Sequence, residues 1–306
     1  MPHSKPRKSL ELQILSHVNS RMDLAPPDRK NLHNLKKGYE GERKFFHLLQ
    51  KELHSECIRL YDLLLESNQT EFQIDNLLLY QNTLIMNEVK NFDGDFFIKD
   101  DKWYAVDSRK EIRNPILQLQ RSEYLLRQLL QQIGVPFQVE AYLVFVNPEF
   151  TLYQGPYDKS LIFPTQLKRY IQKLNQTPSK LTMRHTNLAE ELISLHLPNS
   201  SRERLPEYHY DQLQKGIVCS ECQGIMGRFT KVKLQCKRCR REETIESAVI
   251  RSVAEFHLLF PERRITTTEI YGWCKIIASK KTIRKILMNN LTLVNKGRSS
   301  YYIYEP

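Results

Sequence analysis

The stretch that decides the fold reads FQIDNLLLY at positions 72–80 and TLIMNEVK at positions 83–90, with a Gln-Asn pair between the two runs. Each run has the apolar content of a β-strand, and the Gln-Asn pair has turn chemistry, so the sequence predicts a β-hairpin. Because successive side chains of a strand alternate between its faces, Glu88 and Lys90 share one face and Val89 lies on the other.

Three charged side chains of this hairpin can converge on one point, because Asp75 lies on the first strand and Glu88 and Lys90 lie on the second. Proteins hold Mg²⁺ by one or two carboxylates, while waters and substrate phosphates complete the coordination shell. A lysine beside such a site can orient the attacking water and stabilise charge that develops on a phosphate. The pattern therefore favours a divalent-metal site, and a solvated strand face is the ordinary alternative.

Four short motifs follow one another between residues 36 and 147. They are Gly38-x-x-Gly41-Glu42, then Gln73-Ile74-Asp75, then Glu88-Val89-Lys90 followed by Gly94 and Trp103, and finally Asn114-Pro115 with Gln118. In this order they resemble the nuclease-related domain (NERD) family, a branch of the restriction-endonuclease-like PD-(D/E)xK superfamily.

The resemblance implies an α/β fold with a restriction-endonuclease-like mixed sheet flanked by helices. It also implies metal-dependent hydrolysis of phosphodiester bonds, with catalytic roles for Asp75, Glu88, Lys90, Gln118 and Glu42. Asp75 and Glu88 would bind Mg²⁺ or Mn²⁺. Lys90 would position the water and stabilise the charge on the phosphorane, and the other two residues would assist.

Two of these residues have a second interpretation. Glu42 lies near the start of a helix predicted over residues 36–54, where the helix dipole would favour a carboxylate without any role at a metal. Gln118 and Arg121 are neighbours on one face of a helix predicted over residues 114–132. Both could reach the site or a nucleic-acid backbone, and both could instead be ordinary surface residues.

The same patterns predict element boundaries and buried faces. Pro26-Pro27 is expected to act as a helix breaker, so that the helix at residues 36–54 begins after it. Residues 137–146 are strongly apolar and are expected to form a central strand. The buried face of the helix at residues 114–132 is expected to comprise Leu117, Tyr124, Leu125 and Leu129.

Composition indicates a globular protein. The chain has 306 residues, of which 41% are hydrophobic and 26% are charged, so it has room for two or three domains. No apolar run approaches the length of a membrane span, and residues 1–10 lack the apolar segment of a secretory signal. We therefore expect a cytoplasmic protein that does not bind membranes, whose six cysteines are metal ligands or buried thiols.

The positive charge is concentrated in the C-terminal third. Residues 215–306 hold 18 Lys and Arg against 8 Asp and Glu, a net charge of +10 out of the total of +11. The first 214 residues hold 28 against 27, a net charge of +1. This asymmetry points to a polyanionic partner for the C-terminal third, and a solvated basic surface is the alternative.

Two Cys-x-x-Cys pairs separated by 13 residues supply four thiolates, which suits tetrahedral Zn²⁺. The four residues are Cys219, Cys222, Cys236 and Cys239. The spacing resembles a zinc ribbon, whereas a redox pair would need only one Cys-x-x-Cys. Four protein ligands leave no open position, so the zinc is expected to be structural. Cys57 and Cys274 are expected to be buried thiols.

Three predicted helices and a predicted hairpin follow the cysteines. The helices cover residues 246–260, 266–275 and 279–289, and the hairpin strands cover residues 291–294 and 301–304. This order resembles a winged helix. Basic residues on the third helix and in the hairpin turn are expected to bind nucleic acid, with a solvated face as the alternative. They are Lys280, Lys281, Arg284, Lys285, Lys296 and Arg298.

The sequence thus predicts five segments. They are an N-terminal lead-in (1–35), a NERD nuclease-like domain (36–150), a helical extension and linker (151–214), a zinc ribbon (215–244) and a winged-helix-like module (245–306).

The expected activity is that of a Mg²⁺- or Mn²⁺-dependent endonuclease anchored on nucleic acid by its C-terminal modules, with DNA favoured over RNA. Two alternatives are a DNA-binding protein whose NERD core does not cleave, and an adaptor that binds protein. The presence of Asp75, Glu88 and Lys90 together favours the enzyme. The sequence leaves strand preference and oligomeric state open.

Overall fold

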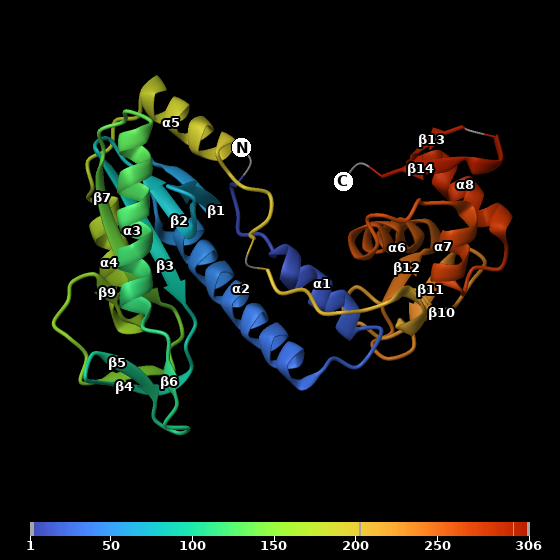
Figure 1. Cartoon of the computed structure of the whole chain (residues 1–306), viewed down its shortest axis with the longest axis horizontal. Helices are drawn as coiled ribbons and strands as arrows, with labels where there is room; N and C mark the ends of the chain where they lie inside the picture. Colours follow the sequence, from blue (N-terminus) through green and yellow to red (C-terminus); the bar gives the residue numbers. More distant parts are fainter. Residues whose placement is uncertain (1–2, 202, 296, 305–306) are drawn as a thin grey trace. The chain divides into compact units, whose positions relative to one another are not determined.

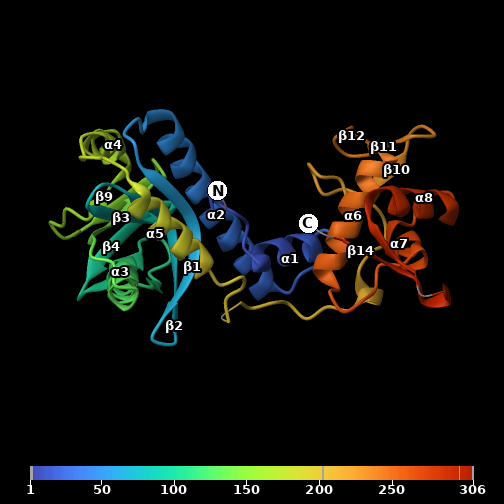
Figure 2. The ribbon, with the colours of Figure 1, turned by 90° about the horizontal axis from the view of Figure 1, so that it is seen from above.

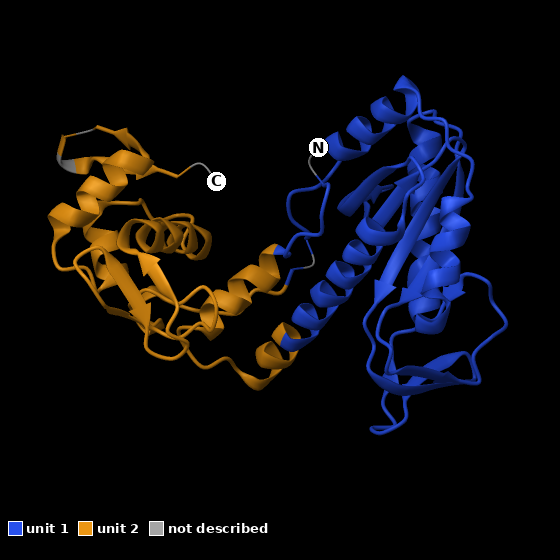
Figure 3. Cartoon of the chain, turned by 180° about the vertical axis from the view of Figure 1, so that it is seen from behind, with its two compact units in different colours: residues 1–9, 33–203 blue, residues 10–32, 204–306 orange. Residues whose placement is uncertain are grey.

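The computed structural model describes residues 3–201, 203–295 and 297–304, and these residues form two compact units (Figure 3). Unit 1 comprises Met1–Ser9 and His33–Glu203, and unit 2 comprises Leu10–Leu32 and Arg204–Pro306. Most of the segment expected to be a lead-in is therefore an integral part of unit 2. No helix in the described part of the chain is long and apolar enough to cross a membrane.

Unit 1 is built on a mixed sheet of five strands in the order β1-β2-β3-β7-β9 (Figure 1). The strands are β1 (Ile58–Ser67), β2 (Thr70–Leu79), β3 (Thr83–Lys90), β7 (Gln138–Phe145) and β9 (Leu161–Ile162). Strand β2 is antiparallel to both β1 and β3, whereas β7 runs parallel to β3 and β9 runs parallel to β7. The predicted hairpin and the interior position of β7 are confirmed.

Helices cover both faces of this sheet (Figures 1 and 2). They are α2 (Pro26–Glu52), α3 (Pro115–Gln132), α4 (Leu167–Asn175) and α5 (Met183–Ser194). Apolar residues of α2 and α4 share one core with the sheet, and those of α3 and α5 share another. Because both faces are covered, strand β3 is buried along almost its whole length. A mixed α/β architecture is thereby confirmed.

A second sheet extends unit 1 and has the strand order β6-β5-β4-β8. Its strands are β4 (Gly94–Lys99), β5 (Lys102–Ala105), β6 (Glu111–Ile112) and β8 (Phe150–Tyr153). Phe150 at the start of β8 stacks on Phe145 at the end of β7, with ring centroids 4.1 Å apart. This aromatic contact joins the second sheet to the central one.

Helix α2 is longer than the sequence suggested. Pro26-Pro27, expected to break the chain, instead forms the first residues of the helix. Proline is tolerated there because the first helical N–H groups have no partner within the helix, and its fixed φ already suits a helix. Glu42 therefore lies in the helix interior, where the dipole of a helix start cannot explain its presence.

Helix α3 begins as predicted, because the Asn114 side chain accepts a hydrogen bond from the N–H of Ile116 at 2.9 Å. The prediction of its buried face was partly wrong. Leu117 and Tyr124 are both 61% exposed, and the buried stripe runs instead through Leu119, Leu125, Leu126, Leu129 and Leu130. The helix carries apolar residues on more than one face, so periodicity alone did not decide which face meets the sheet.

Unit 2 contains α1 (Leu10–Asn19), a small three-stranded sheet, three further helices and a two-stranded hairpin. The sheet comprises β10 (Met226–Arg228), β11 (Lys233–Cys236) and β12 (Glu242–Thr244). The three helices that follow are α6 (Ile245–Leu259), α7 (Thr267–Cys274) and α8 (Lys280–Asn290). The hairpin comprises β13 (Thr292–Val294) and β14 (Tyr301–Ile303). Helices α6, α7 and α8 and strands β13 and β14 start and end within about two residues of the predicted limits, an ordinary error for such boundaries.

A buried ion pair joins the N-terminal part of unit 2 to α6. The Arg21 guanidinium donates to both carboxylate oxygens of Glu255, at 2.8 and 2.6 Å, and lies 3.9 Å from the ring of Trp273. Burial acts to raise the pKa of Glu255, but hydrogen bonds from Arg21 and His17 outweigh it and lower the pKa to about 2. Removing either of the two stretches of the chain that form unit 2 would therefore leave one buried charge without its partner.

Candidate active site and metal centre

A buried amide network fixes the register of three strands below the candidate site. Asn87 Nδ2 donates to Asn76 Oδ1 at 2.8 Å, and Asn76 Nδ2 donates to the carbonyl of Leu60 at 3.2 Å. The hydroxyl of Tyr170 on α4 donates to Asn87 Oδ1 at 2.5 Å. Buried polar groups are costly unless they are bonded, so these contacts hold β1, β2 and β3 in one alignment.

The sheet opens one residue beyond this network. Pairing between β2 and β3 ends at Asn76 and Asn87, although β3 stays paired with β7 as far as Lys90. The Val89 N–H, freed from β2, donates instead to Asp75 Oδ2 at 2.7 Å. Asp75 and Glu88 are therefore opposite each other in the register of β2 and β3, but their backbones form no hydrogen bond to each other.

Glu88 is held by two donors. Lys90 Nζ and Gln118 Nε2 both contact Glu88 Oε1, at 2.7 and 2.5 Å, and Lys90 also donates to Gln118 Oε1 at 3.2 Å. The side chains of Glu88 and Lys90 are 4% and 17% exposed. The structure thus brings together the predicted Glu88, Lys90 and Gln118, the last of them from α3, while Arg121 on the next turn is exposed to solvent.

Helix α2 approaches the end of β3 closely at Gly41. A Cβ on Gly41 would lie 2.6 Å from the Cβ of Asn91, whereas one on Gly38 would meet nothing within 4 Å. Asn91 Nδ2 also donates to the Lys37 carbonyl at 2.8 Å. This contact sets Glu42, the next residue of α2, beside the charged groups of the hairpin.

The electrostatics of the site follow from an excess of carboxylates over cations. Burial, then the charges of Asp62 and Glu88, raise the pKa of Glu42 to about 7. Burial, then the charges of Glu88 and Glu42, raise the pKa of Asp75 well above its ordinary value. Burial lowers the pKa of Lys90, but the same carboxylates outweigh it, so that pKa is raised overall.

Asp62 is a member of this site that sequence reasoning missed. Its φ of 54° lies in the left-handed region, which a residue other than glycine rarely adopts inside a strand. It lies opposite Asp75, at the one gap in the ladder between β1 and β2. Its carboxylate accepts a hydrogen bond from Gln73 Nε2 at 2.9 Å. The available signal was an Asp between two apolar runs, Leu60-Tyr61 and Leu63-Leu64-Leu65.

The strand alternation shifts by one residue at this level. Leu60 before Asp62 and Leu63 after it belong to the same core cluster, although three positions separate them, and Leu77 and Ile74 on β2 behave in the same way. Alternating strands would place residues three apart on opposite faces. The left-handed conformation of Asp62 accounts for the shift on β1.

The four cysteines of unit 2 form the second site. Their sulfur atoms lie within 4.8 Å of one another, with 3.6 Å between Cys219 and Cys239 and 3.4 Å between Cys222 and Cys236. A tetrahedral Zn–S shell requires separations of about 3.8 Å, so this group could hold zinc. Of the remaining cysteines, Cys274 is buried and Cys57 is only partly buried.

In the part of the chain that the structure describes, these cysteines are the one group of three or more His, Cys, Asp or Glu ligand atoms gathered so closely. The carboxylates of unit 1 are more widely spaced. Mg²⁺ does not require a complete protein shell, because it keeps several waters and uses substrate phosphates as ligands.

The basic side chains predicted on the third helix lie on α8 and are exposed, while Ile283, Ile286 and Leu287 are buried. The exposed residues are Lys280, Lys281, Arg284 and Lys285. Lys296 and the side chain of Arg298 lie outside the described part of the structure.

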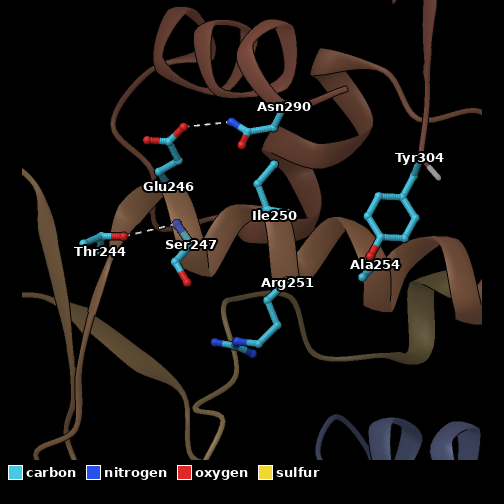
Figure 4. A pocket seen from close by; sticks show the side chains of 8 residues that line it. All are labelled: Thr244, Glu246, Ser247, Ile250, Arg251, Ala254, Asn290 and Tyr304. Carbon is cyan, nitrogen blue, oxygen red and sulfur yellow. Dashed lines mark hydrogen bonds between the residues drawn. The ribbon is translucent and has the colours of Figure 1, made fainter. Parts of the chain in front are cut away.

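A hollow of about 610 Å³ lies along α6 in unit 2, apart from both sets of ligands (Figure 4). Its polar groups are already paired: Asn290 donates to Glu246 at 2.8 Å, and the Ser247 N–H donates to Thr244 Oγ1 at 3.2 Å. The Arg251 guanidinium, which also lines it, is bonded to Glu243. The charged side chains that line the hollow therefore already have hydrogen-bond partners.

We predict opposite effects on stability for two alanine substitutions in α2. Gly41→Ala should lower the free energy of unfolding by roughly 1–3 kcal/mol, because the new Cβ meets the backbone-proximal Cβ of Asn91. Gly38→Ala should raise it by up to about 1 kcal/mol, because alanine favours a helix and the site is open. Thermal unfolding of the two variants checks both signs, and equal effects would contradict the close approach at Gly41.

A second prediction concerns charge. Asp62→Asn should lower the pKa of Glu42 from about 7, without restoring its ordinary value, because burial is the larger cause and remains. The pKa can be read from a ¹³C NMR titration of the glutamate carboxyl carbons, with Glu42→Gln assigning the signal. Asp107→Asn, at an exposed position, is the control. If the pKa of Glu42 is unchanged in Asp62→Asn, Asp62 does not act on the charges of the site.

One of three comparisons with known proteins found a match. The family model of the nuclease-related domain (NERD) matches residues 37–146, a span that includes Glu42, Asp75, Glu88, Lys90 and Gln118. Comparisons with curated proteins and with solved structures found no match. The core of unit 1 is therefore similar to nuclease-related domains.

Proposed function

We propose that the chain is a metal-dependent nuclease that hydrolyses phosphodiester bonds in nucleic acid, with DNA favoured over RNA. One observation carries the proposal. At the point where the sheet opens, Glu88 is bonded to both Lys90 and Gln118, beside two carboxylates, Asp75 and Glu42, whose pKa values are raised. Groups with strongly shifted pKa values concentrate at functional sites. The match to a nuclease-related domain supports the assignment.

The residues present fit a divalent cation. Asp75 and Glu88 offer oxygen ligands from adjacent strands. Burial, and then neighbouring negative charge, raises the pKa values of Asp75 and Glu42, and a cation would offset that charge. When bound, Mg²⁺ or Mn²⁺ would make a water more acidic and stabilise negative charge on the phosphate. We assign its binding to Asp75 and Glu88.

The chain's own groups would divide the remaining work. Lys90, held at 2.7 Å from Glu88, would stabilise charge on the phosphate and orient the attacking water. Gln118 fixes the orientation of Glu88 through its 2.5 Å hydrogen bond. Glu42, which lies close enough to Glu88 and Lys90 to feel their charges, would assist at the same site.

We assign structural Zn²⁺ to the four cysteines of unit 2 as a zinc ribbon. They leave no ligand position open for catalysis. We also assign a winged helix to the segment that follows, because its described elements occur in the order of three helices and then a two-stranded hairpin. In this assignment α8 is the helix that contacts nucleic acid, and its four exposed basic residues bind phosphates.

We predict that Glu88→Ala and Lys90→Ala each lower the rate of metal-dependent cleavage by roughly 10²-fold or more, because each removes a group that acts on the developing charge. The assay uses labelled single- and double-stranded DNA and RNA, with and without Mn²⁺. Glu111→Ala, which removes an exposed carboxylate of unit 1, is the control and should cleave normally.

Two results would contradict the assignment. Normal cleavage by either active-site variant would exclude this group of residues as the catalytic site. If the wild-type protein binds nucleic acid but cleaves no member of the panel, the chain is a nucleic-acid-binding protein and not a nuclease.

The role of α8 has its own prediction. Lys281→Glu with Arg284→Glu should weaken binding to DNA and flatten its dependence on salt, because each lost phosphate contact reduces the salt slope by roughly one. Lys159→Glu with Lys180→Glu, at exposed positions of unit 1, gives the same change in net charge and should have the smaller effect. Equal losses in the two double variants would show that net charge, and not α8, governs affinity.

A further inference from the structure

The turn between β10 and β11 presents apolar side chains to solvent. Phe229 is 52% exposed and Val232 is 68% exposed. Neither position is required by the core of the sheet, whose buried members on these strands are Met226, Leu234 and Cys236. The turn therefore leaves an aromatic face and an apolar side chain available to a ligand.

The turn holds these side chains in place. The N–H groups of Phe229 and Thr230 donate to the carbonyl of Lys233, at 3.2 and 3.0 Å. The Thr230 hydroxyl oxygen accepts from the N–H groups of Val232 and Lys233, at 3.2 and 2.9 Å. The Ile245 N–H, at the start of α6, donates to the Val232 carbonyl at 2.9 Å. The tip is thus organised before any ligand binds, which lowers the entropy cost of binding.

A lysine side chain lies on the strand face that is expected to carry the aromatic ring. Because Gly227 pairs with Gln235 and strand faces alternate, Phe229 is expected on the same face as Gly227. The side chain of Lys237 lies over that glycine, since a Cβ there would be 3.3 Å from Lys237 Cε. Gly227 therefore makes room for a lysine on the face that carries Phe229.

The charge around the tip is of one sign. Residues 228–241 contain seven Lys and Arg and no Asp or Glu. Lys233 is paired with Glu242 at 3.0 Å. Among the described residues, Arg228, Lys231 and Lys237 are exposed and form no ion pair. A polyanion is consequently the partner that complements this surface.

We propose that the hairpin tip is a stacking site for an unpaired base of single-stranded nucleic acid. The ring of Phe229 would receive the face of the base, while Arg228, Lys231 and Lys237 contact the flanking phosphates. Duplex nucleic acid does not suit the site, because its base faces are already stacked. An acidic protein would satisfy the charges but has no need of the exposed ring. The inference shares a nucleic-acid ligand with the proposed nuclease and does not depend on cleavage.

The test uses fluorescence from a tryptophan placed at the tip. The two native tryptophans, Trp103 and Trp273, are both 0% exposed, so in Phe229→Trp the exposed indole reports on the tip. The full chain carries Glu88→Gln as well, which prevents cleavage during titration, and no chelator is added. The ligands are single-stranded DNA, single-stranded RNA, the DNA duplex, and a strand of the same length with abasic sites in place of bases.

We expect single strands with bases to quench the new indole and abasic strands to bind without comparable quenching, because only the former offer a ring to stack. Comparison of DNA with RNA shows which sugar is accepted. In the same background, Phe229→Ala should weaken single-strand binding by roughly tenfold, the loss of one stacked base. Tyr157→Ala, which removes a 96% exposed aromatic residue of unit 1, should leave it unchanged.

Three outcomes would overturn the inference: equal quenching by the abasic strand, unchanged single-strand affinity in Phe229→Ala, or a response to anionic lipid vesicles with none to single strands. The result is separable from the nuclease assignment. Absence of the stacking signal, together with normal cleavage by a Phe229→Ala chain that keeps Glu88, rejects the tip alone. A stacking signal at the tip, together with a wild-type chain that never cleaves, rejects the nuclease alone.

Discussion

The crowding of carboxylates around Lys90 is the constraint on which unit 1 depends. Glu42, Asp75 and Glu88 come from a helix and two strands, and Asp62 adds a fourth negative charge on β1. Like charges held together in a partly buried place oppose folding, so the arrangement must be stabilised elsewhere. The amide network centred on Asn87 and the apolar cores on both faces of the sheet supply that stabilisation.

The site is correspondingly built on rigid elements. The opening between β2 and β3 frees the Val89 N–H to bond Asp75, and the close approach at Gly41 places Glu42. Gln118 arrives from α3, whose start is set by its Asn114 cap. Side chains on packed strands and helices keep their geometry better than side chains on loops. A metal-dependent reaction, which needs oxygen ligands in defined positions, is consistent with such a construction.

Local chemistry made part of this structure predictable. The hairpin, the Asn114 cap and the four-cysteine spacing each depend on neighbouring residues, and each is present. Features set by distant contacts were not predictable. Asp62 owes its left-handed backbone to the alignment of β1 with β2. The placement of residues 10–32 in unit 2 depends on Arg21 and Glu255, which are 234 positions apart in the sequence. Neither hydrophobic periodicity nor a local motif predicts contacts between residues so far apart in the sequence.

That ion pair also bears on how function is divided along the chain. Residues 215–306 carry +10 of the +11 net charge, yet their unit is completed by residues 10–32. A chain cut after residue 214 would leave Arg21 without Glu255 and the apolar residues of α1 without α6. It would therefore lose the proposed basic surface and the packing of residues 10–32 at the same time. Substitution of surface charges avoids this confusion, because Lys281 and Arg284 are exposed and their helix keeps its buried face. The chemistry proposed for unit 1 and the nucleic-acid affinity proposed for unit 2 are therefore separable by point substitution and not by truncation.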